Sequence, residues 1–370
     1  MVEIEELSGS GSDTSSSEME FDPSSHIWAD LVPDDQIDGP EPLCPILYDP
    51  DYRRVMGLFR ALRAKYNGEV EVSERSLALT FYLVHLNPAN YTIWQYRAQV
   101  LIQMATDEDH ALLLKKELEF LDHFALINMK NYQVWQHRKV IVSMLGDPSK
   151  ELDFTKAVLS EDAKNYHTWA YRQWVLSHFG GLDVTPITSN VPGAGSSPEL
   201  WQGENEFTKT LLEQDIRNNS AFNHRWYCLF GRRMHGRDQL PAEVESVRDA
   251  EISYAMTLID RAPNNASAWN YLRGLFESIS PSRQFEEYDH EVLKLLRVQD
   301  HAYAVAHPEE DEAGRTPPHA LEWLLDSAAQ QLPHTNKDTQ RKKIQLLLQR
   351  LRHADPARNK YWSYVEQQLL

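Results

Sequence analysis

The sequence contains few cysteines and no long apolar run. Its two cysteines, Cys44 and Cys228, are too few for a disulfide framework and cannot form a zinc site by themselves. No uninterrupted apolar stretch has the length needed to span a membrane, and the N-terminus lacks the basic and apolar regions of a signal peptide. We therefore expect a cytoplasmic protein without membrane insertion.

Basic residues are absent from the first part of the chain. The first Lys or Arg is Arg53, and the fourteen Asp and Glu residues that precede it account for most of the formal net charge of −18. Neither part has the basic composition that nucleic-acid binding requires, so no nucleic-acid partner is expected. Residues 1–25 are acidic, Ser-rich and almost without apolar periodicity, which predicts a disordered acidic tail. The Pro-rich segment 26–50 is expected to lie extended along the folded body.

Strand-like alternation of useful length is also missing. From about residue 51 the apolar residues instead recur with a helical period, which predicts an all-α domain over 51–370. Two stretches rich in Pro and Gly or in Pro and acidic residues, 182–198 and 301–318, are expected to be surface inserts. The expected architecture is a crescent-shaped superhelix, a solenoid of antiparallel helical hairpins.

A short motif, Asn-x-x-x-Trp-x-x-Arg, recurs along this helical region. Complete copies begin at Asn90, Asn131 and Asn165. Looser copies begin at Asn218, with Phe in place of Trp, and at Asn265, with Leu in place of Arg. The aromatic positions are 41, 34, 53 and 47 residues apart, which is typical of stacked helical hairpins.

The motif has a local physical interpretation. Asn is a favoured N-cap, and Trp and Arg three residues apart share one face of the helix that follows. The Trp can fill the gap between adjacent hairpins, while the Arg can stack on an aromatic ring or pair with a carboxylate of the neighbouring repeat. On this interpretation alone, both residues are structural.

The residues flanking each cap differ between copies and are the candidates for function. Equivalent positions of a solenoid line up along one edge, so these helix N-termini should form a rim. Free N–H groups, the positive helix end and a nearby Lys together favour a phosphate-like anion. The residues before the cap are Ala89, Lys130, Lys164, Arg217 and Asn264, and those after it are Tyr91, Tyr132, Tyr166, Asn219 and Ala266.

Each rim residue also has an ordinary structural alternative. A Lys before an N-cap can be simply solvated, and a Tyr there can pack on the preceding loop. Gln133 and His167, which follow the Tyr in their copies, should face the same rim. The sequence contains no glycine-rich phosphate loop, no closely spaced set of metal ligands and no nucleophile elbow, so a self-sufficient active site is not expected.

These strings identify a family resemblance. Residues 130–135 (Lys-Asn-Tyr-Gln-Val-Trp) and 162–167 (Asp-Ala-Lys-Asn-Tyr-His) closely resemble the α subunit shared by protein farnesyltransferase and protein geranylgeranyltransferase type I. Further similar segments are 28–30, 218–220, 268–272 and 361–364. The resemblance covers roughly residues 28–370 and leaves out the acidic tail and both inserts.

The resemblance implies that this chain is half of a heterodimeric enzyme. Its partner would be a β subunit that binds the catalytic Zn²⁺, and Mg²⁺ would accompany the prenyl diphosphate. Farnesyl or geranylgeranyl would be transferred to the Cys of a C-terminal CaaX motif on protein substrates. No metal ligand is implied for this chain itself.

The resemblance also implies roles for individual residues. Lys130 would be catalytic, by neutralising charge on the diphosphate leaving group. Gln133 would bind the substrate's C-terminal carboxylate, and Tyr91 would line the pocket for the peptide side chains. The other residues that match the family's substrate-binding rim are Tyr132, Lys164, Asn165, Tyr166 and His167.

Two alternatives remain at this point. A non-catalytic helical-repeat scaffold could use the same rim to bind peptides, and it would explain the Trp periodicity equally well. The α subunit of a Rab-type geranylgeranyltransferase is the other, although its extra immunoglobulin-like and leucine-rich domains are not expected within 370 residues. The prenyl group is not predicted, because one α subunit would serve both β partners.

Overall fold

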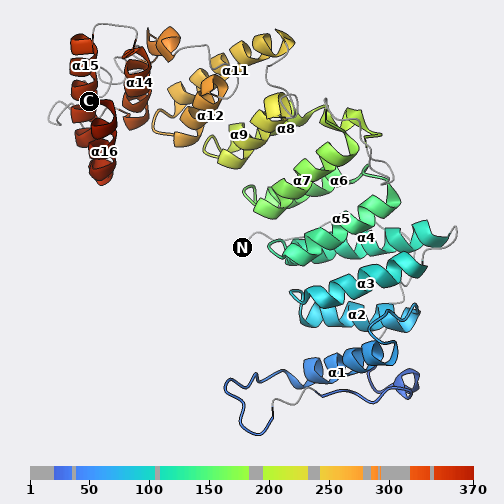
Figure 1. Cartoon of the computed structure of the whole chain (residues 1–370). Helices are drawn as coiled ribbons and strands as arrows, with labels where there is room; N and C mark the ends of the chain where they lie inside the picture. Colours follow the sequence, from blue (N-terminus) through green and yellow to red (C-terminus); the bar gives the residue numbers. More distant parts are fainter. Residues whose placement is uncertain are drawn as a thin grey trace, which may run out of the picture. The chain divides into compact units, whose positions relative to one another are not determined.

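The computed structural model describes residues 21–35, 39–104, 109–182, 195–231, 242–277, 285–290, 292, 317–333 and 337–370. The chain divides into two compact units, residues 1–148 and 149–370. Each unit is built from antiparallel helical hairpins (Figure 1). Within the described ranges there is no β-strand, so the fold is an all-α helical-repeat solenoid, as predicted.

The first unit contains two complete hairpins preceded by a single helix. Helix α2 pairs with α3 and α4 pairs with α5, while α3 also packs against α5 (Figure 1). The motif helices are therefore neighbours in this unit. Its elements are η1 (His26–Trp28), α1 (Pro50–Lys65), α2 (Glu74–Leu86), α3 (Tyr91–Met104), α4 (Asp109–Ile127) and α5 (Tyr132–Leu145).

The second unit continues the same pairing. Helix α6 pairs with α7, α8 with α9, α11 with α12, and α14 with α15. Motif helix α9 packs against both α7 and α12. Its elements are α6 (Glu151–Glu161), α7 (Tyr166–Phe179), η2 (Pro198–Trp201), α8 (Glu204–Gln214), α9 (Asn219–Trp226), η3 (Tyr227–Gly231), α11 (Ala242–Arg261), α12 (Ala266–Glu277), η4 (Phe285–Tyr288), α14 (Pro318–Gln331), α15 (Lys337–Ala354), η6 (Pro356–Arg358) and α16 (Asn359–Leu369).

The apolar periodicity accounts for how these helices bury one face. Val55, Leu58, Phe59 and Leu62 on α1 are spaced by three or four residues and are all buried. Helix α5 ends at Gly146, whose φ of 67° gives a left-handed cap from which the backbone N–H bonds to the helix. No described helix is long and apolar enough to cross a membrane.

Towards the C-terminus, α15 begins at Lys337, and a 3-10 turn covers Phe285–Tyr288. Most of the two expected inserts, 183–194 and 301–316, lies outside the described residues.

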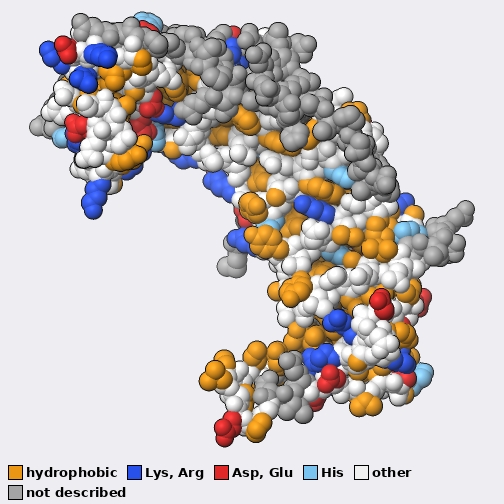
Figure 2. All heavy atoms as spheres, in the orientation of Figure 1, with side chains coloured by type: hydrophobic (Ala, Val, Ile, Leu, Met, Phe, Trp, Pro, Cys, Tyr) orange, Lys and Arg blue, Asp and Glu red, His pale blue; other side chains and the backbone are white. Residues whose placement is uncertain are grey.

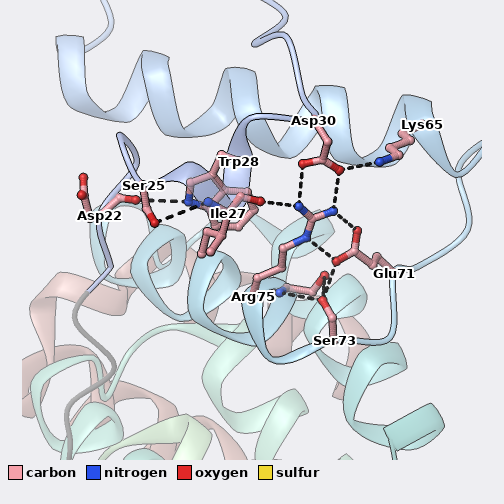
Figure 3. Close-up of polar contacts among 10 residues, drawn as sticks. Asp22, Ser25, Ile27, Trp28, Asp30, Lys65, Glu71, Ser73 and Arg75 are labelled. Atoms are coloured by element: carbon pink, nitrogen blue, oxygen red, sulfur yellow. Dashed lines mark hydrogen bonds and ion pairs between the residues drawn. The ribbon is translucent and has the colours of Figure 1, made fainter.

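The N-terminal segment is anchored to the first hairpin by Arg75 of α2. The Arg75 guanidinium donates to both carboxylate oxygens of Asp30, at 2.7 and 3.0 Å, and to the backbone carbonyl of Ile27 at 2.6 Å (Figure 3). It also pairs with Glu71 and lies over the buried Trp28 ring. Of the stretch expected to be a disordered tail, only residues 21–25 belong to the described part of the chain, and there the ring of Phe21 stacks on Tyr82.

The later part of the Pro-rich segment, which is expected to lie extended along the folded body, is mostly exposed to solvent. Asp34 still bonds to the Gly57 carbonyl, but nearly every residue from Gly39 to Asp49 is exposed. Leu43 and Leu47 are fully exposed, and orange side chains mark this arm before α1 in Figure 2. The arm meets α1 at its end, where the Tyr48 ring contacts Tyr52 and the Asp49 side chain caps the helix.

Candidate functional site

The cap asparagines start the motif helices as predicted. In all five copies the Asn side-chain oxygen accepts a hydrogen bond from a backbone N–H in the first turn. Asn131, for example, accepts from the N–H of Gln133 at 2.8 Å. Each cap fixes where its helix begins and hence where the flanking rim residues lie.

The motif tryptophans have a second role that their spacing in the sequence does not indicate. In the four copies that contain Trp, the indole N–H donates to the backbone carbonyl six residues earlier, in the loop before the cap. For Trp135 the acceptor is the carbonyl of Met129, 2.8 Å away. The rings also fill the gap between hairpins, as predicted: Trp94 packs against Phe120 and Phe124 of the next hairpin.

Three of the motif arginines pair with a glutamate of the neighbouring repeat, as the structural interpretation predicts, whereas Arg138 donates to Asp122 of its own hairpin at 2.7 Å. Arg97 donates to both carboxylate oxygens of Glu117 at 2.7 and 2.5 Å, and to the carbonyl of Leu77 at 2.7 Å. It thereby links its own hairpin, through α2, to the next one, through α4. The equivalent buried pairs in the second unit are Arg172 with Glu204 and Arg225 with Glu251.

A third component recurs at a fixed distance. The residue two after the motif aromatic is His or Tyr, and its polar tip contacts a buried glutamate 20 residues earlier in four hairpins. His137 Nε2 lies 2.8 Å from the Glu117 carboxylate that also binds Arg97. We call this arrangement of Arg97, Glu117 and His137 the clasp. A spacing of 20 between acid and His or Tyr was the sequence signal that could have located it.

The clasp keeps its carboxylate charged inside the protein. Burial alone would raise the pKa of Glu117, but the Arg97 charge and the hydrogen bonds from His137 and Arg97 outweigh burial and lower that pKa to about 2. An uncompensated buried carboxylate would instead be strongly destabilising. The clasp therefore fixes the positions of α3, α4 and α5 relative to one another.

The rim of the first unit contains an open groove of about 610 Å³ at the start of α5. Lys130, Tyr132 and Gln133 border it together with Ala89, the position equivalent to Lys130 in the preceding copy. Adjacent hairpins thus share one edge within this unit, as predicted. Tyr91, two residues beyond Ala89, is 67% exposed and available for contact. The full lining is Ala89, Ile127, Asn128, Met129, Lys130, Asn131, Tyr132 and Gln133.

Lys130 is the cation of this groove. Its side chain is exposed, and within the described part of the chain no carboxylate lies within ion-pair distance of it. It directly precedes the positive N-terminal end of α5, where free backbone N–H groups also favour an anion. The half-buried Gln133 adds an amide with two donors on the same side.

The other predicted residues lie at the rim of the second unit and form their own group. Lys164 pairs with Asp215, with 2.8 Å between ammonium and carboxylate, so this Lys is partly neutralised. Tyr166 is 69% exposed and meets His167 edge-on, with 5.5 Å between ring centroids. Partial burial lowers the pKa of His167, which favours its neutral form.

Asn165 has a different character from its neighbours. It is only 2% exposed, and its side-chain oxygen caps α7 through the N–H of Thr168 at 3.0 Å. Its geometry therefore assigns it to the helix start and leaves no exposed amide for a ligand. The pattern of cap residues already predicted this capping, although the resemblance placed Asn165 with substrate-binding residues.

One described group has the donor types of a metal site. The side chains of Glu204, His224 and Cys228 are buried and offer ligand atoms within 4.8 Å of one another. However, the Glu204 carboxylate is already neutralised by Arg172 and bonded to His224, in the second-unit counterpart of the clasp. The residues fit a protein ion pair better than a bound metal ion.

Known proteins share both the repeat and the fold. The family model described as "Protein prenyltransferase alpha subunit repeat" matches residues 73–104, 114–145, 148–179, 201–231 and 248–279. A pea (Pisum sativum) "Protein farnesyltransferase/geranylgeranyltransferase type-1 subunit alpha" is 41% identical over 68% of this chain and 66% of the pea protein. The tomato (Solanum lycopersicum) protein of the same name is 35% identical over 91% of this chain and 88% of its own length.

A solved structure agrees with these relatives. A chain of Candida albicans protein geranylgeranyltransferase-I complexed with GGPP superposes with a TM-score of 0.69 at 28% identity, covering 92% of this chain and 98% of that one. Identity above 30% across most of a relative's length, together with the five matched repeats, decides the family. The chain belongs to the α subunits of protein farnesyltransferase and type-1 geranylgeranyltransferase.

Proposed function

We propose that this chain acts with a β subunit as a protein prenyltransferase. The pair would transfer farnesyl or geranylgeranyl from its diphosphate to the Cys thiolate of a CaaX motif at the C-terminus of a protein substrate. The observation that carries the proposal is Lys130, an exposed cation without a carboxylate partner among the described residues, at the groove where α5 begins. The compartment expected for this reaction is the cytoplasm.

Lys130 is proposed as the catalytic residue of this chain. As the bond between the prenyl carbon and the diphosphate oxygen breaks, negative charge grows on the leaving group. An ammonium already placed beside that oxygen stabilises the transition state more than the ground state. Because no described carboxylate competes for it, the full charge of Lys130 is available to the diphosphate.

The peptide substrate is proposed to lie along the same rim. The Gln133 amide would donate to the C-terminal carboxylate, and the exposed Tyr91 ring would contact the side chains of the two aliphatic residues. Tyr132 offers a further exposed ring in the first unit. Taken by itself, the second unit offers the exposed Tyr166 ring and His167, whose lowered pKa favours the neutral imidazole. Lys164, held by Asp215, would contribute less charge than Lys130.

The metals belong to other parts of the assembly. Residues of the β subunit would hold Zn²⁺, which would lower the pKa of the substrate thiol so that its proton is lost to solvent, and Mg²⁺ would accompany the diphosphate. The described cluster of Glu204, His224 and Cys228 is engaged by Arg172, and the contribution proposed for this chain is cationic and hydrogen-bonding.

Single-turnover kinetics of the reconstituted heterodimer test the proposal, comparing Lys130→Ala with Lys164→Ala. We expect Lys130→Ala to slow the chemical step about a hundredfold, equivalent to about 3 kcal/mol, with a much smaller loss of diphosphate affinity. Lys164→Ala, the matched change at the equivalent position, should have a smaller effect. A Lys130→Ala rate within about threefold of wild type would refute the catalytic role.

A further inference from the structure

The loop that carries Lys130 is held by several hydrogen bonds within the loop and to the last turn of α4. The N–H of Asn131 donates to the carbonyl of Asn128 at 2.9 Å. Asn128 in turn donates its own N–H and its side-chain amide to the carbonyl of Phe124, at 3.0 and 3.1 Å. These bonds close the turn between α4 and α5, but none of them reaches the peptide that immediately precedes Lys130.

That peptide is anchored by Trp135. Its indole N–H donates to the Met129 carbonyl at 2.8 Å, and its ring is only 4% exposed. Because the peptide unit is planar, fixing the Met129 carbonyl also fixes the direction in which the chain enters Lys130. The ring is itself part of α5, so this bond ties the Lys130 backbone to the helix whose N-terminus faces the groove.

We propose that Trp135 is a positioning residue for Lys130, and this inference rests on the proposed function above. Stabilisation of a leaving group by a preplaced cation depends on geometry, and a displacement of about 1 Å can reduce rates by up to about a hundredfold. Because Lys130 has no ion-pair partner among the described residues, only its backbone sets the point from which its side chain starts. The indole bond fixes the peptide oxygen next to that point.

The comparison between repeats separates this role from general architecture. The same indole-to-carbonyl bond recurs at Trp94, Trp169 and Trp269. The residue after the acceptor is Ala, Lys and Asn in those copies, so only Trp135 and Trp169 anchor a Lys. The Lys of the Trp169 copy has an additional restraint, its ion pair with Asp215, which has no counterpart at Lys130 among the described residues.

The test is Trp135→Phe in the complete heterodimer, which keeps an aromatic ring but removes the N–H donor. We expect single-turnover transfer to slow about tenfold, with diphosphate and peptide affinities changed less than about twofold. The matched control is Trp269→Phe, which deletes the same bond in a copy without a Lys. That control should lower the melting temperature to a similar extent and leave the rate unchanged.

A double-mutant cycle shows whether Trp135 works through Lys130. In a Lys130→Ala background, Trp135→Phe should slow transfer no further, because the group that it positions is gone. An undiminished effect there, a wild-type rate for the single variant, or equal slowing by Trp269→Phe would each overturn the inference. If Lys130→Ala itself leaves the rate unchanged, the proposed function of Lys130 fails first, and the two failures are thereby distinguished.

A second variant covers the case in which Trp135→Phe does not fold. Benzothienylalanine at position 135 keeps the size of the indole ring but replaces its N–H by sulfur, so packing is retained while the donor is lost. The same slowing is expected from it. A benzothienylalanine protein with the wild-type single-turnover rate would refute the positioning role.

Discussion

Replacing Glu117 by Gln perturbs the clasp with almost no change in volume. The carboxylate is 4% exposed and accepts from Arg97 at 2.7 and 2.5 Å and from His137 at 2.8 Å. A Gln amide can accept through only one oxygen and carries no charge. The variant therefore leaves the Arg97 guanidinium, itself 5% exposed, without its counter-charge inside the protein.

The magnitude follows from the shift of the carboxyl pKa. Against its usual value of 4.5, the pKa of Glu117 is lowered to about 2, because the Arg97 charge and the hydrogen bonds more than offset the burial that would raise it. At about 1.4 kcal/mol per pKa unit, the charged form contributes roughly 3 kcal/mol to folding at neutral pH. Breaking a buried pair by removing one partner typically costs about 3–5 kcal/mol, which agrees with this figure.

Urea unfolding followed by far-ultraviolet circular dichroism measures this loss. The matched control is Glu119→Gln, the same charge change on the same helix at an exposed position, where an effect below about 0.5 kcal/mol is expected. The solenoid need not unfold in one step, so the relevant quantity is the free energy of the transition that involves the first unit. Equal destabilisation by the two variants would refute the clasp as a major source of stability.

The pH dependence of unfolding is a second, independent test of the contribution of Glu117 to stability. Since the folded pKa of Glu117 lies below the unfolded one, its contribution is complete above about pH 4.5 and is lost as the pH falls towards 2. Glu117→Gln should remove this part of the acid transition, so its stability should fall less steeply than that of wild type over that range. Parallel stability curves for the two proteins would mean that another group dominates the acid transition.

Two further predictions concern the rim and the N-terminus. Gln133→Ala in the heterodimer should weaken peptide binding by about 1.5–3 kcal/mol and leave diphosphate affinity unchanged, as measured by binding titration. Gln136→Ala, a change at an exposed position of the same helix, is the control. Equal weakening of both ligands by Gln133→Ala would point to a disturbed helix start. Arg75→Ala should release the segment around Trp28, seen as faster chymotryptic cleavage and red-shifted fluorescence, whereas the exposed Arg54→Ala should change neither.

The local features were predictable because their determinants are short-range. An N-cap needs only Asn at a helix start, and the Trp spacing reports the hairpin period directly. For each motif Arg, the sequence predicted that the partner is an aromatic ring or a carboxylate of the neighbouring repeat, but not which residue it is. Helix α4 offers Glu119 and Asp122 besides Glu117, and only the fold shows that Glu117 faces Arg97. The separation also varies, being 20 residues for Arg97 but 32 for Arg172, since an insert intervenes in the second case.

In the candidate site, too, the local features were predictable from the sequence and the tertiary contacts were not. Lys130 and Lys164 occupy equivalent places in nearly identical strings, so the residues alone do not rank them. The difference lies in a contact from the next hairpin, where Asp215 reaches Lys164 at 2.8 Å. The sequence places Asn165 among rim residues, but its side-chain oxygen accepts a hydrogen bond from the N–H of Thr168 and so caps α7. Such distinctions depend on tertiary contacts that have no fixed sequence separation.

Arg97 and His137 of the clasp lie within the first two turns of α3 and α5, the helices whose N-termini form the rim, and this connects stability with function. Trp135 and His137 lie on α5 only two residues apart: one anchors the loop of Lys130, and the other binds Glu117 and, through it, Arg97 of α3. The buried charged contacts of the clasp and the direct packing of Trp94 on His137 therefore fix together the separation between the start of α3, where Tyr91 lies, and the start of α5. A solenoid transmits strain mainly between adjacent repeats, so loosening the clasp should misplace Tyr91 relative to Lys130 while leaving remote hairpins intact.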